Sequence, residues 1–294
     1  MSGPGVASLG LPSQSPKPGK RGRLRRGVYV LPSLFTVGTL VCGYFAILST
    51  LKGTQMLAAG ASVSLSLAAF DSAAKAIGWA VLFDGLDGRI ARLTNSTSDF
   101  GREFDSLADV VTFGLAPAFL AYAWGIRAID EIYGTPLGQH LRHIGWIVTF
   151  AYVICGAARL ARFNIDAGKP LSDRRYFVGL PIPAAAGVIA ALVHWAKYPV
   201  NEGAYGVVWL SIVAVVAFLM VSRMRYYSFK SLDLRRRRPY VIIIIIGLIV
   251  WAIWAFSEPV LLTIALTYLL SAPIARLISK LRPRPPAPEE VHAA

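Results

Sequence analysis

Apolar stretches of roughly 20 residues, the length that crosses a bilayer as a helix, alternate with short polar segments along most of this chain. In lipid, a helix bonds all its backbone polar groups within itself, so it can span the hydrocarbon region. The pattern predicts an all-α fold: a polytopic integral membrane protein, a bundle of about eight transmembrane helices. The predicted spans are 29–51, 72–93, 105–126, 143–163, 181–198, 205–222, 239–256 and 259–278.

Residues 54–70 are apolar as well, but they are rich in Ala, Ser and Gly. A ninth span here would place the basic N-terminal segment and the basic segment 89–102 on opposite sides of the membrane. Basic segments of membrane proteins favour the cytoplasmic side, so we expect both to lie there. Residues 54–70 are therefore predicted to form a re-entrant or interfacial segment.

Positive charges fall mostly on one side of this predicted topology. The net charge of +14 suggests nucleic-acid binding, but the arginines cluster beside apolar stretches. Because cytoplasmic loops carry an excess of Lys and Arg, both termini are predicted to be cytoplasmic, and no nucleic-acid partner is expected. All but five of the 30 Lys and Arg residues then lie on the cytoplasmic side; the five are Lys52, Lys75, Arg127, Arg142 and Lys197.

The chain is predicted to contain one membrane domain and two tails. Residues 1–27 are rich in Ser, Gly, Pro and basic residues, and residues 281–294 are rich in Pro. Such segments bury too little apolar surface to fold, so both tails are predicted to be disordered. Residues 28–280 form the membrane domain, whose surroundings are the lipid bilayer.

Four aspartates stand where the second predicted span ends and the third begins. They are Asp84, Asp87, Asp105 and Asp109, in the pattern D-x-x-D-G-x-x-A-R, eight residues, G-x-x-x-D-x-x-x-D. Residues three or four apart share a helix face, and a short turn containing Asn95, Ser96 and Gly101 would make the two helices antiparallel neighbours. Carboxylates are costly beside hydrocarbon, so this convergence indicates a functional site.

The converging carboxylates are predicted to bind divalent metal, Mg²⁺ or Mn²⁺, as one or two ions, with two expected. Without a counter-charge they would repel one another, and hard cations select oxygen ligands. Two such ions can hold a phosphoryl group during displacement. Gly88 and Gly101 would let a phosphate approach the helix backbone, and Arg92 could bind two phosphate oxygens. The alternative is a solvated helix hairpin neutralised by Arg89, Arg92 and Arg102.

At every defining position this pattern matches the signature of the CDP-alcohol phosphotransferase family, so the chain resembles these membrane enzymes. They transfer a phosphoryl-lipid group from a CDP-linked donor to an alcohol and release CMP. The resemblance implies that Asp84, Asp87 and Asp105 are metal ligands, and that Asp109 completes the site and acts as general base. It also implies a homodimer and a set of positions that bind CDP-diacylglycerol, namely Gly88, Ala91, Arg92 and Gly101.

Four further stretches are similar to one branch of this family, the bacterial and archaeal phosphatidylserine synthases. They are LPSLFTVGTLVCGYFAI (31–47), DSLADVVTFGLAP (105–117), ARLARFN (158–164) and FVGLPIPAAAG (177–187). This resemblance implies transfer from CDP-diacylglycerol to L-serine, in the inner (cytoplasmic) membrane, with the active site facing the cytoplasm. Members of the branch often carry Asn where this chain has Ser33 and Thr39, so no nucleotide contact is carried over onto the first span.

Arg159, Arg162 and Asn164 are candidates for the acceptor pocket. The two arginines are three residues apart near the predicted cytoplasmic end of the fourth span, where they could receive the serine carboxylate or the donor's phosphate. Simple anchoring of the helix end by positive charge is the alternative for both. Asn164, at the predicted start of the following loop, has the weaker basis.

No residue in the motif has the surroundings of an activated nucleophile, because no Ser, Cys or His stands there at a suitable spacing from a base. A direct displacement is therefore expected, with Asp109 as the proton acceptor. The histidines fall near the predicted outer face or in a tail and are assigned no chemistry; they are His140, His143, His194 and His292.

Three other functions compete with serine transfer. The same chemistry could act on glycerol phosphate or inositol phosphate, although these acceptors carry an extra phosphate and should need more cationic ligands. A divalent-cation transporter would also contain intramembrane acids, but near the bilayer midplane at broken helices. A structural scaffold would leave the aspartate motif unexplained.

Overall fold

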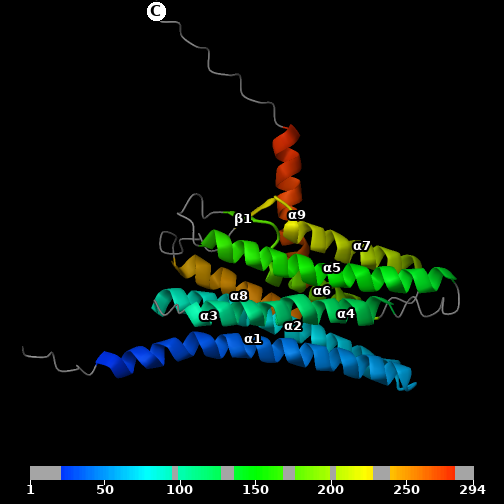
Figure 1. Cartoon of the computed structure of the whole chain (residues 1–294), viewed down its shortest axis with the longest axis horizontal. Coiled ribbons are helices and arrows are strands. Elements are labelled where there is room, and N and C mark those ends of the chain that lie inside the picture. The colour runs from blue at the N-terminus through cyan, green and yellow to red at the C-terminus, as the bar shows by residue number, and fades with distance from the viewer. Residues whose placement is uncertain are drawn as a thin grey trace, which may run out of the picture.

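The described part of the chain in this computed structural model, residues 21–94, 99–126, 136–167, 176–198, 203–227 and 239–281, forms a bundle of long helices (Figure 1). The helices are α1 (Arg21–Ala58), α2 (Val63–Thr94), α3 (Asp99–Asp109), η1 (Val110–Leu115), α4 (Ala116–Ile126), α5 (Pro136–Ala167), α6 (Ile182–Ala196), α7 (Gly203–Val221), α8 (Pro239–Ala255) and α9 (Ser257–Leu281). α3, η1 and α4 follow one another without a break and together correspond to one apolar stretch of the sequence. Each of the other helices corresponds to one further stretch. The prediction of an all-α membrane bundle is confirmed.

Five helical segments within the described residues are long and apolar enough to cross a membrane. They are Leu34–Ala58, Val63–Ile90, Phe100–Gly125, Gly138–Ile165 and Ser257–Leu281. Two further apolar segments, Ile182–Ala196 and Tyr205–Val221, are shorter. A helix of 15 residues such as α6 is about 22 Å long, less than the hydrocarbon core of about 30 Å. The count of eight spans and the cytoplasmic position of the termini therefore stay predictions.

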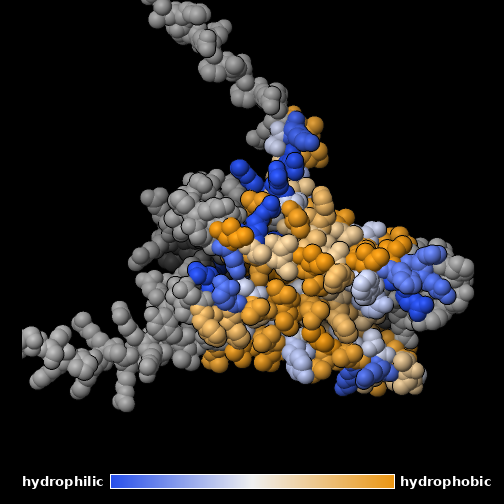
Figure 2. Space-filling view, in the orientation of Figure 1, coloured by the Kyte–Doolittle hydropathy of each residue, from blue (hydrophilic) through white to orange (hydrophobic). Residues whose placement is uncertain are grey.

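Large apolar side chains cover the outside of the bundle. Figure 2 shows a broad hydrophobic face across the molecule, with hydrophilic residues gathered toward its ends. On α1 the exposed side chains include Leu34, Val41 and Phe45, and on α5 they include Trp146 and Phe150. So large an apolar surface suits a surrounding of lipid, where these side chains need no burial within the protein.

Small residues are buried on both α2 and α6, two helices that contact each other. Ala73 and Ala80 on α2, and Ala185 and Ala186 on α6, are fully buried. Small side chains let two helix backbones approach closely, which is the usual way in which helices pack inside a membrane.

The structure corrects the interpretation of residues 54–70. They are the end of α1 and the beginning of α2, joined by the turn 59–62, in which Gly60 adopts a φ of +69°. A φ in this range suits glycine, because it has no Cβ to clash with the backbone. The segment is thus the tip of a helical hairpin and neither a re-entrant segment nor a separate span. At its other end α1 begins at Arg21, inside the segment 1–27 that was predicted to be disordered; residues 1–20 and 282–294 lie outside the described part.

The third apolar segment also differs from its prediction. Its helix begins at Asp99, so Gly101 lies within α3, not in the predicted turn. Asn95 and Ser96, the other residues of that turn, lie outside the described residues. The π-helix η1 was not predicted either, because a wide helical turn leaves no periodic signal in an apolar sequence.

Two short strands tie the helix ends together near the end of α5. β1 (Tyr176–Val178) pairs antiparallel with β2 (Arg225–Tyr227). Gly179 follows β1 with a φ of +82°, and its N–H donates to the Met224 carbonyl at 2.8 Å. The Tyr226 hydroxyl donates to the Leu269 carbonyl of α9 at 3.2 Å, and beyond this contact α9 (red) projects away from the other helices (Figure 1).

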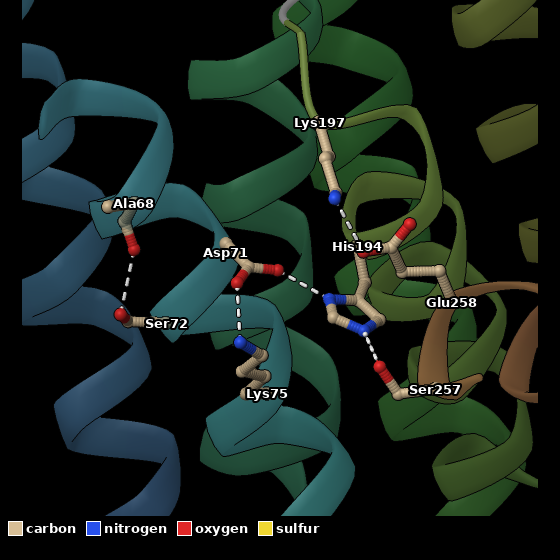
Figure 3. Close-up of polar contacts among 8 residues, drawn as sticks. All are labelled: Ala68, Asp71, Ser72, Lys75, His194, Lys197, Ser257 and Glu258. Carbon is tan, nitrogen blue, oxygen red and sulfur yellow. Dashed lines mark hydrogen bonds and ion pairs between the residues drawn. The ribbon is translucent and has the colours of Figure 1, made fainter. Parts of the chain in front are cut away.

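A second group of polar residues joins α2, α6 and α9 (Figure 3). We call it the distal polar cluster; its members are Asp71, Lys75, His194 and Ser257. His194 bonds to Asp71 through Nδ1 and to the Ser257 hydroxyl through Nε2 at 3.0 Å, while Lys75 pairs with Asp71 at 2.7 Å. Asp71 precedes Asp84 on α2 by 13 residues, a distance of about 20 Å along the helix.

Candidate metal and nucleotide site

Three of the four predicted aspartates come together between α2 and α3, about three turns before the end of α2. Asp84 on α2 and Asp105 and Asp109 on α3 each offer one carboxylate oxygen, and these oxygens lie within 4.8 Å of one another. Asp84 and Asp105 are half-buried, whereas the side chain of Asp109 is only 8% exposed. We call these residues the three-carboxylate group.

Asp109 is held at the junction between α3 and the π-helix η1. The carbonyl of Phe113 in η1 accepts a hydrogen bond from the Tyr152 hydroxyl of α5 at 3.1 Å. The Thr112 hydroxyl donates to the Thr39 carbonyl of α1 at 3.2 Å. A Cβ on Gly43 of α1 would approach the Thr112 hydroxyl oxygen to 2.5 Å, so only glycine fits there. Contacts from α1 and α5 therefore fix the wide turn that follows Asp109, and π-helical turns of this kind are frequent at functional sites.

Arg159 of α5 lies buried beside the three-carboxylate group. Its side chain is 8% exposed, and its guanidinium stacks over the Phe163 ring at 5.3 Å from the ring centre. It is close enough to Asp109 and Asp84 to interact with both electrostatically. Three carboxylates and one guanidinium leave two negative charges, which one divalent cation would neutralise.

The residues present fit a divalent metal ion. Carboxylate oxygens are the preferred ligands of hard cations such as Mg²⁺ and Mn²⁺. Two unit charges 4.8 Å apart repel by about 3.5 kcal/mol at an effective dielectric constant of about 20, so the group needs more positive charge than Arg159 supplies. Asp109 Oδ1 is also buried without a hydrogen-bond partner among the described residues, which leaves it available as a ligand atom.

Asp87 does not join the three-carboxylate group, although the sequence predicts that all four acids converge. Its side chain is 7% exposed, and Oδ2 accepts a hydrogen bond of 2.5 Å from the Thr36 hydroxyl of α1. Its electrostatic effect on Asp109 is smaller than that of Asp84 or Asp105. One oxygen of Asp87 is thus directed toward α1.

The predicted nucleotide-binding positions lie on the same two helices. Gly88 is on α2, and a Cβ added there would meet no described atom within 4 Å, so a ligand has room beside it. Gly101 is on α3, two turns before Asp109. Ala91 and Arg92 belong to the end of α2, but their side chains are outside the described part of the structure.

Of the three residues predicted to bind the acceptor, the structure places one, Arg159, beside the three-carboxylate group. Arg159 lies at the three-carboxylate group, as described above, whereas the side chain of Arg162 is exposed. The Asn164 amide donates to the Ser106 hydroxyl at 2.9 Å, which links α5 to α3 beside Asp105. Asn164 thus has a structural role in holding α3, and the serine-binding role predicted for it stays a prediction.

Thr36 is a polar neighbour of the aspartate motif that the sequence did not predict. The available signal was the repetition of Ser33, Thr36 and Thr39 at every third position of an otherwise apolar helix. Such hydroxyls commonly bond to their own helix backbone, so the sequence alone does not separate a partner of the motif from an ordinary helical threonine.

Comparison with known proteins decides the family. The profile of the CDP-alcohol phosphatidyltransferases matches residues 29–221, which include the whole aspartate motif. The chain belongs to the CDP-alcohol phosphatidyltransferase family. Enzymes of this family generally use a divalent metal, and the three-carboxylate group of this family member fits one. The matched range ends before α8 and α9 begin.

Relatives with assigned names are similar over most of the chain. One from Helicobacter pylori is 36% identical over 76% of this chain and 82% of its own length. One from Mycobacterium leprae is 32% identical over 87% of this chain and 78% of its own, and one from Bacillus subtilis is 34% identical over 68% and 92%. All three are named CDP-diacylglycerol–serine O-phosphatidyltransferase.

Proposed function

We propose that this protein transfers the phosphatidyl group of CDP-diacylglycerol to the hydroxyl of L-serine, which yields phosphatidylserine and CMP. One observation carries the proposal: Asp84, Asp105 and Asp109 converge in a chain whose relatives are named for this reaction. The buried arginine beside these acids adds a binding group for an anionic substrate.

The reaction is a direct displacement at the phosphorus that carries the diacylglycerol. A bond forms from the serine oxygen to this phosphorus as the bond to the CMP oxygen breaks, and CMP leaves with the electron pair. The serine hydroxyl loses its proton to a base. Asp109 is the proposed base, because it is a buried carboxylate within the group and its Oδ1 has no hydrogen-bond partner in the described residues.

Two divalent ions, Mg²⁺ or Mn²⁺, are proposed, with Asp84, Asp87, Asp105 and Asp109 as their ligands. When bound, such ions neutralise charge on the diphosphate and on the leaving CMP. The three-carboxylate group would hold one of these ions, because its oxygens lie close together and its net charge is negative. Asp87, which lies nearly one turn further along α2, would contribute to the second.

The remaining site residues are proposed to bind the two substrates. Arg159, which lies beside the acids that would hold the metal, would receive the serine carboxylate or a donor phosphate oxygen. The open space at Gly88 admits the CDP moiety. The other proposed contacts to the substrates are Ala91, Arg92, Gly101, Arg162 and Asn164.

The proposed setting is the inner membrane, with the site at its cytoplasmic face and two copies of the chain as a dimer. Asp84 and Asp105 lie toward the ends of the segments Val63–Ile90 and Phe100–Gly125, away from their middles. This position suits an enzyme that takes water-soluble serine and releases CMP. It does not suit a cation transporter, whose acids lie near the bilayer midplane.

The test is CMP release by the purified protein in vesicles that contain CDP-diacylglycerol and Mn²⁺. We expect release that depends on L-serine and a lipid product that contains the serine. Glycerol phosphate and inositol phosphate are the comparison acceptors. Release driven by either of these, with none driven by serine, would keep the chemistry and overturn the acceptor.

A further inference from the structure

Thr36 of α1, which is not part of the aspartate motif, makes a direct hydrogen bond to one of its aspartates. Its side chain is 4% exposed, and its hydroxyl donates to Asp87 Oδ2 at 2.5 Å across 51 residues of sequence. Hydrogen bonds to ionised acceptors are shorter and stronger than neutral ones, and the partner here is a buried carboxylate.

This hydrogen bond links α1 to α2. Several other hydroxyls in the described helices, those of Thr39, Thr50, Ser72 and Thr149, donate instead to the carbonyl four residues earlier in their own helix. Threonine is also restricted in its χ1 rotation, which fixes the direction of the bond.

The contact orients the Asp87 carboxylate. Oδ2 accepts the hydrogen bond from Thr36, and Oδ1 together with the second lone pair of Oδ2 can serve a metal ion. A residue that hydrogen-bonds to a metal ligand raises metal affinity, because the ligand side chain is already oriented before the ion binds and loses less rotational freedom on binding. Without Thr36, the Asp87 carboxylate would be buried with one oxygen lacking its donor.

We infer that Thr36 is a positioning residue of the metal site, which holds Asp87 from α1 in the orientation that binds the ion. The inference rests on the proposed function in one respect, namely that Asp87 is a metal ligand. It assigns the first helix, α1, a part in the site.

The experiment compares Thr36→Val, which keeps the shape and removes the hydroxyl, with Thr36→Ser, which keeps the hydroxyl. Thr39→Val is the matched control, because Thr39 lies on the same helix, is 2% exposed, and its hydroxyl donates to the Phe35 carbonyl of that helix at 3.1 Å. Mn²⁺ binding to each purified protein is measured directly by titration. The midpoint of thermal unfolding without metal reports folding.

We expect Thr36→Val to bind Mn²⁺ about tenfold or more weakly, and Thr36→Ser and Thr39→Val to bind within about threefold of the unchanged protein. Equal affinity of Thr36→Val and the unchanged protein would overturn the inference. Since binding is measured without substrate, a protein that binds Mn²⁺ but releases no CMP with serine fails the proposed function and leaves this comparison intact.

Combining Thr36→Val with Asp87→Asn distinguishes a role of Thr36 that acts through Asp87 from a purely structural role. If Thr36 acts through Asp87, then Thr36→Val adds no further loss of Mn²⁺ affinity in the Asp87→Asn protein. An equal loss in both backgrounds would show that Thr36 acts by another route and would also overturn the inference. Thr36→Ala replaces Thr36→Val in both comparisons if the valine variant does not fold.

Discussion

The buried imidazole of His194 on α6 bonds to the carboxylate of Asp71 on α2 (Figure 3). Its second ring nitrogen bonds to Ser257, the first residue of α9, so one side chain joins three helices. Beside it Lys197 pairs with Glu258 at 2.6 Å, again between the end of α6 and the start of α9. The distal polar cluster therefore fixes the beginning of α9, a helix of which few other residues are buried.

His194→Ala is expected to destabilise the protein by about 1–3 kcal/mol, because it removes the buried imidazole that bonds to both Asp71 and Ser257. The measurement is the midpoint of thermal unfolding in detergent. His143→Ala is the control, since His143 is exposed and bonds to the Gln139 carbonyl of its own helix. An unchanged midpoint for His194→Ala would contradict a role of the cluster in docking α9. Because the cluster lies far from the aspartates, we expect the KM for serine to change by less than about twofold.

The three-carboxylate group is expected to act as one unit. Asp84→Asn, Asp105→Asn and Asp109→Asn should each lower the rate of CMP release by at least about a thousandfold, and pairs of these changes should cost little more than one. Glu103→Gln is the control, because Glu103 is an exposed acid on the same helix α3. Near-normal turnover by Asp109→Asn at saturating Mn²⁺ would exclude Asp109 as the base.

The sequence predicted the helices and the approach of three of the four aspartates, for a physical reason. Long apolar stretches have few alternatives to a helix in lipid, and acids three or four residues apart must share a helix face. What it did not predict depends on contacts between distant segments. The donation from Thr36 turns Asp87 toward α1, and the contact of His194 with Asp71 joins residues 123 positions apart. The π-helix after Asp109 is set by packing against α1 and α5, which no local pattern encodes.

Removal of divalent metal is expected to stop CMP release and to lower the thermal stability of the protein. A chelator should abolish the activity, and Mn²⁺ or Mg²⁺ should restore it. At a concentration 100 times its dissociation constant, a metal that binds only the folded state adds about 2.7 kcal/mol of stability. This gain should disappear in Asp109→Asn and persist in Glu103→Gln. Full activity after exhaustive chelation would contradict the proposed role of the aspartates.

Arg159 is expected to bind an anionic substrate group, and Arg159→Lys tests whether its geometry matters as well as its charge. The guanidinium is buried, lies over the Phe163 ring and faces Asp109 and Asp84. An ammonium keeps the charge but cannot bind two oxygens side by side or stack in the same way. We expect the KM for serine or for CDP-diacylglycerol to rise about tenfold or more, with a smaller change in kcat.

Arg162→Lys is the comparison variant, since Arg162 is exposed on the same helix three residues later and is also a proposed substrate contact. Kinetic constants within about twofold of the unchanged protein would indicate that the Arg162 charge only anchors the helix end, and a raised KM would support its proposed contact with a substrate. The substrate whose KM rises in Arg159→Lys identifies the group that the guanidinium binds. A rise for serine alone indicates the serine carboxylate, and a rise for CDP-diacylglycerol alone indicates a phosphate of the donor. Unchanged KM values for both substrates would show that Arg159 serves only to balance the charge of the three carboxylates.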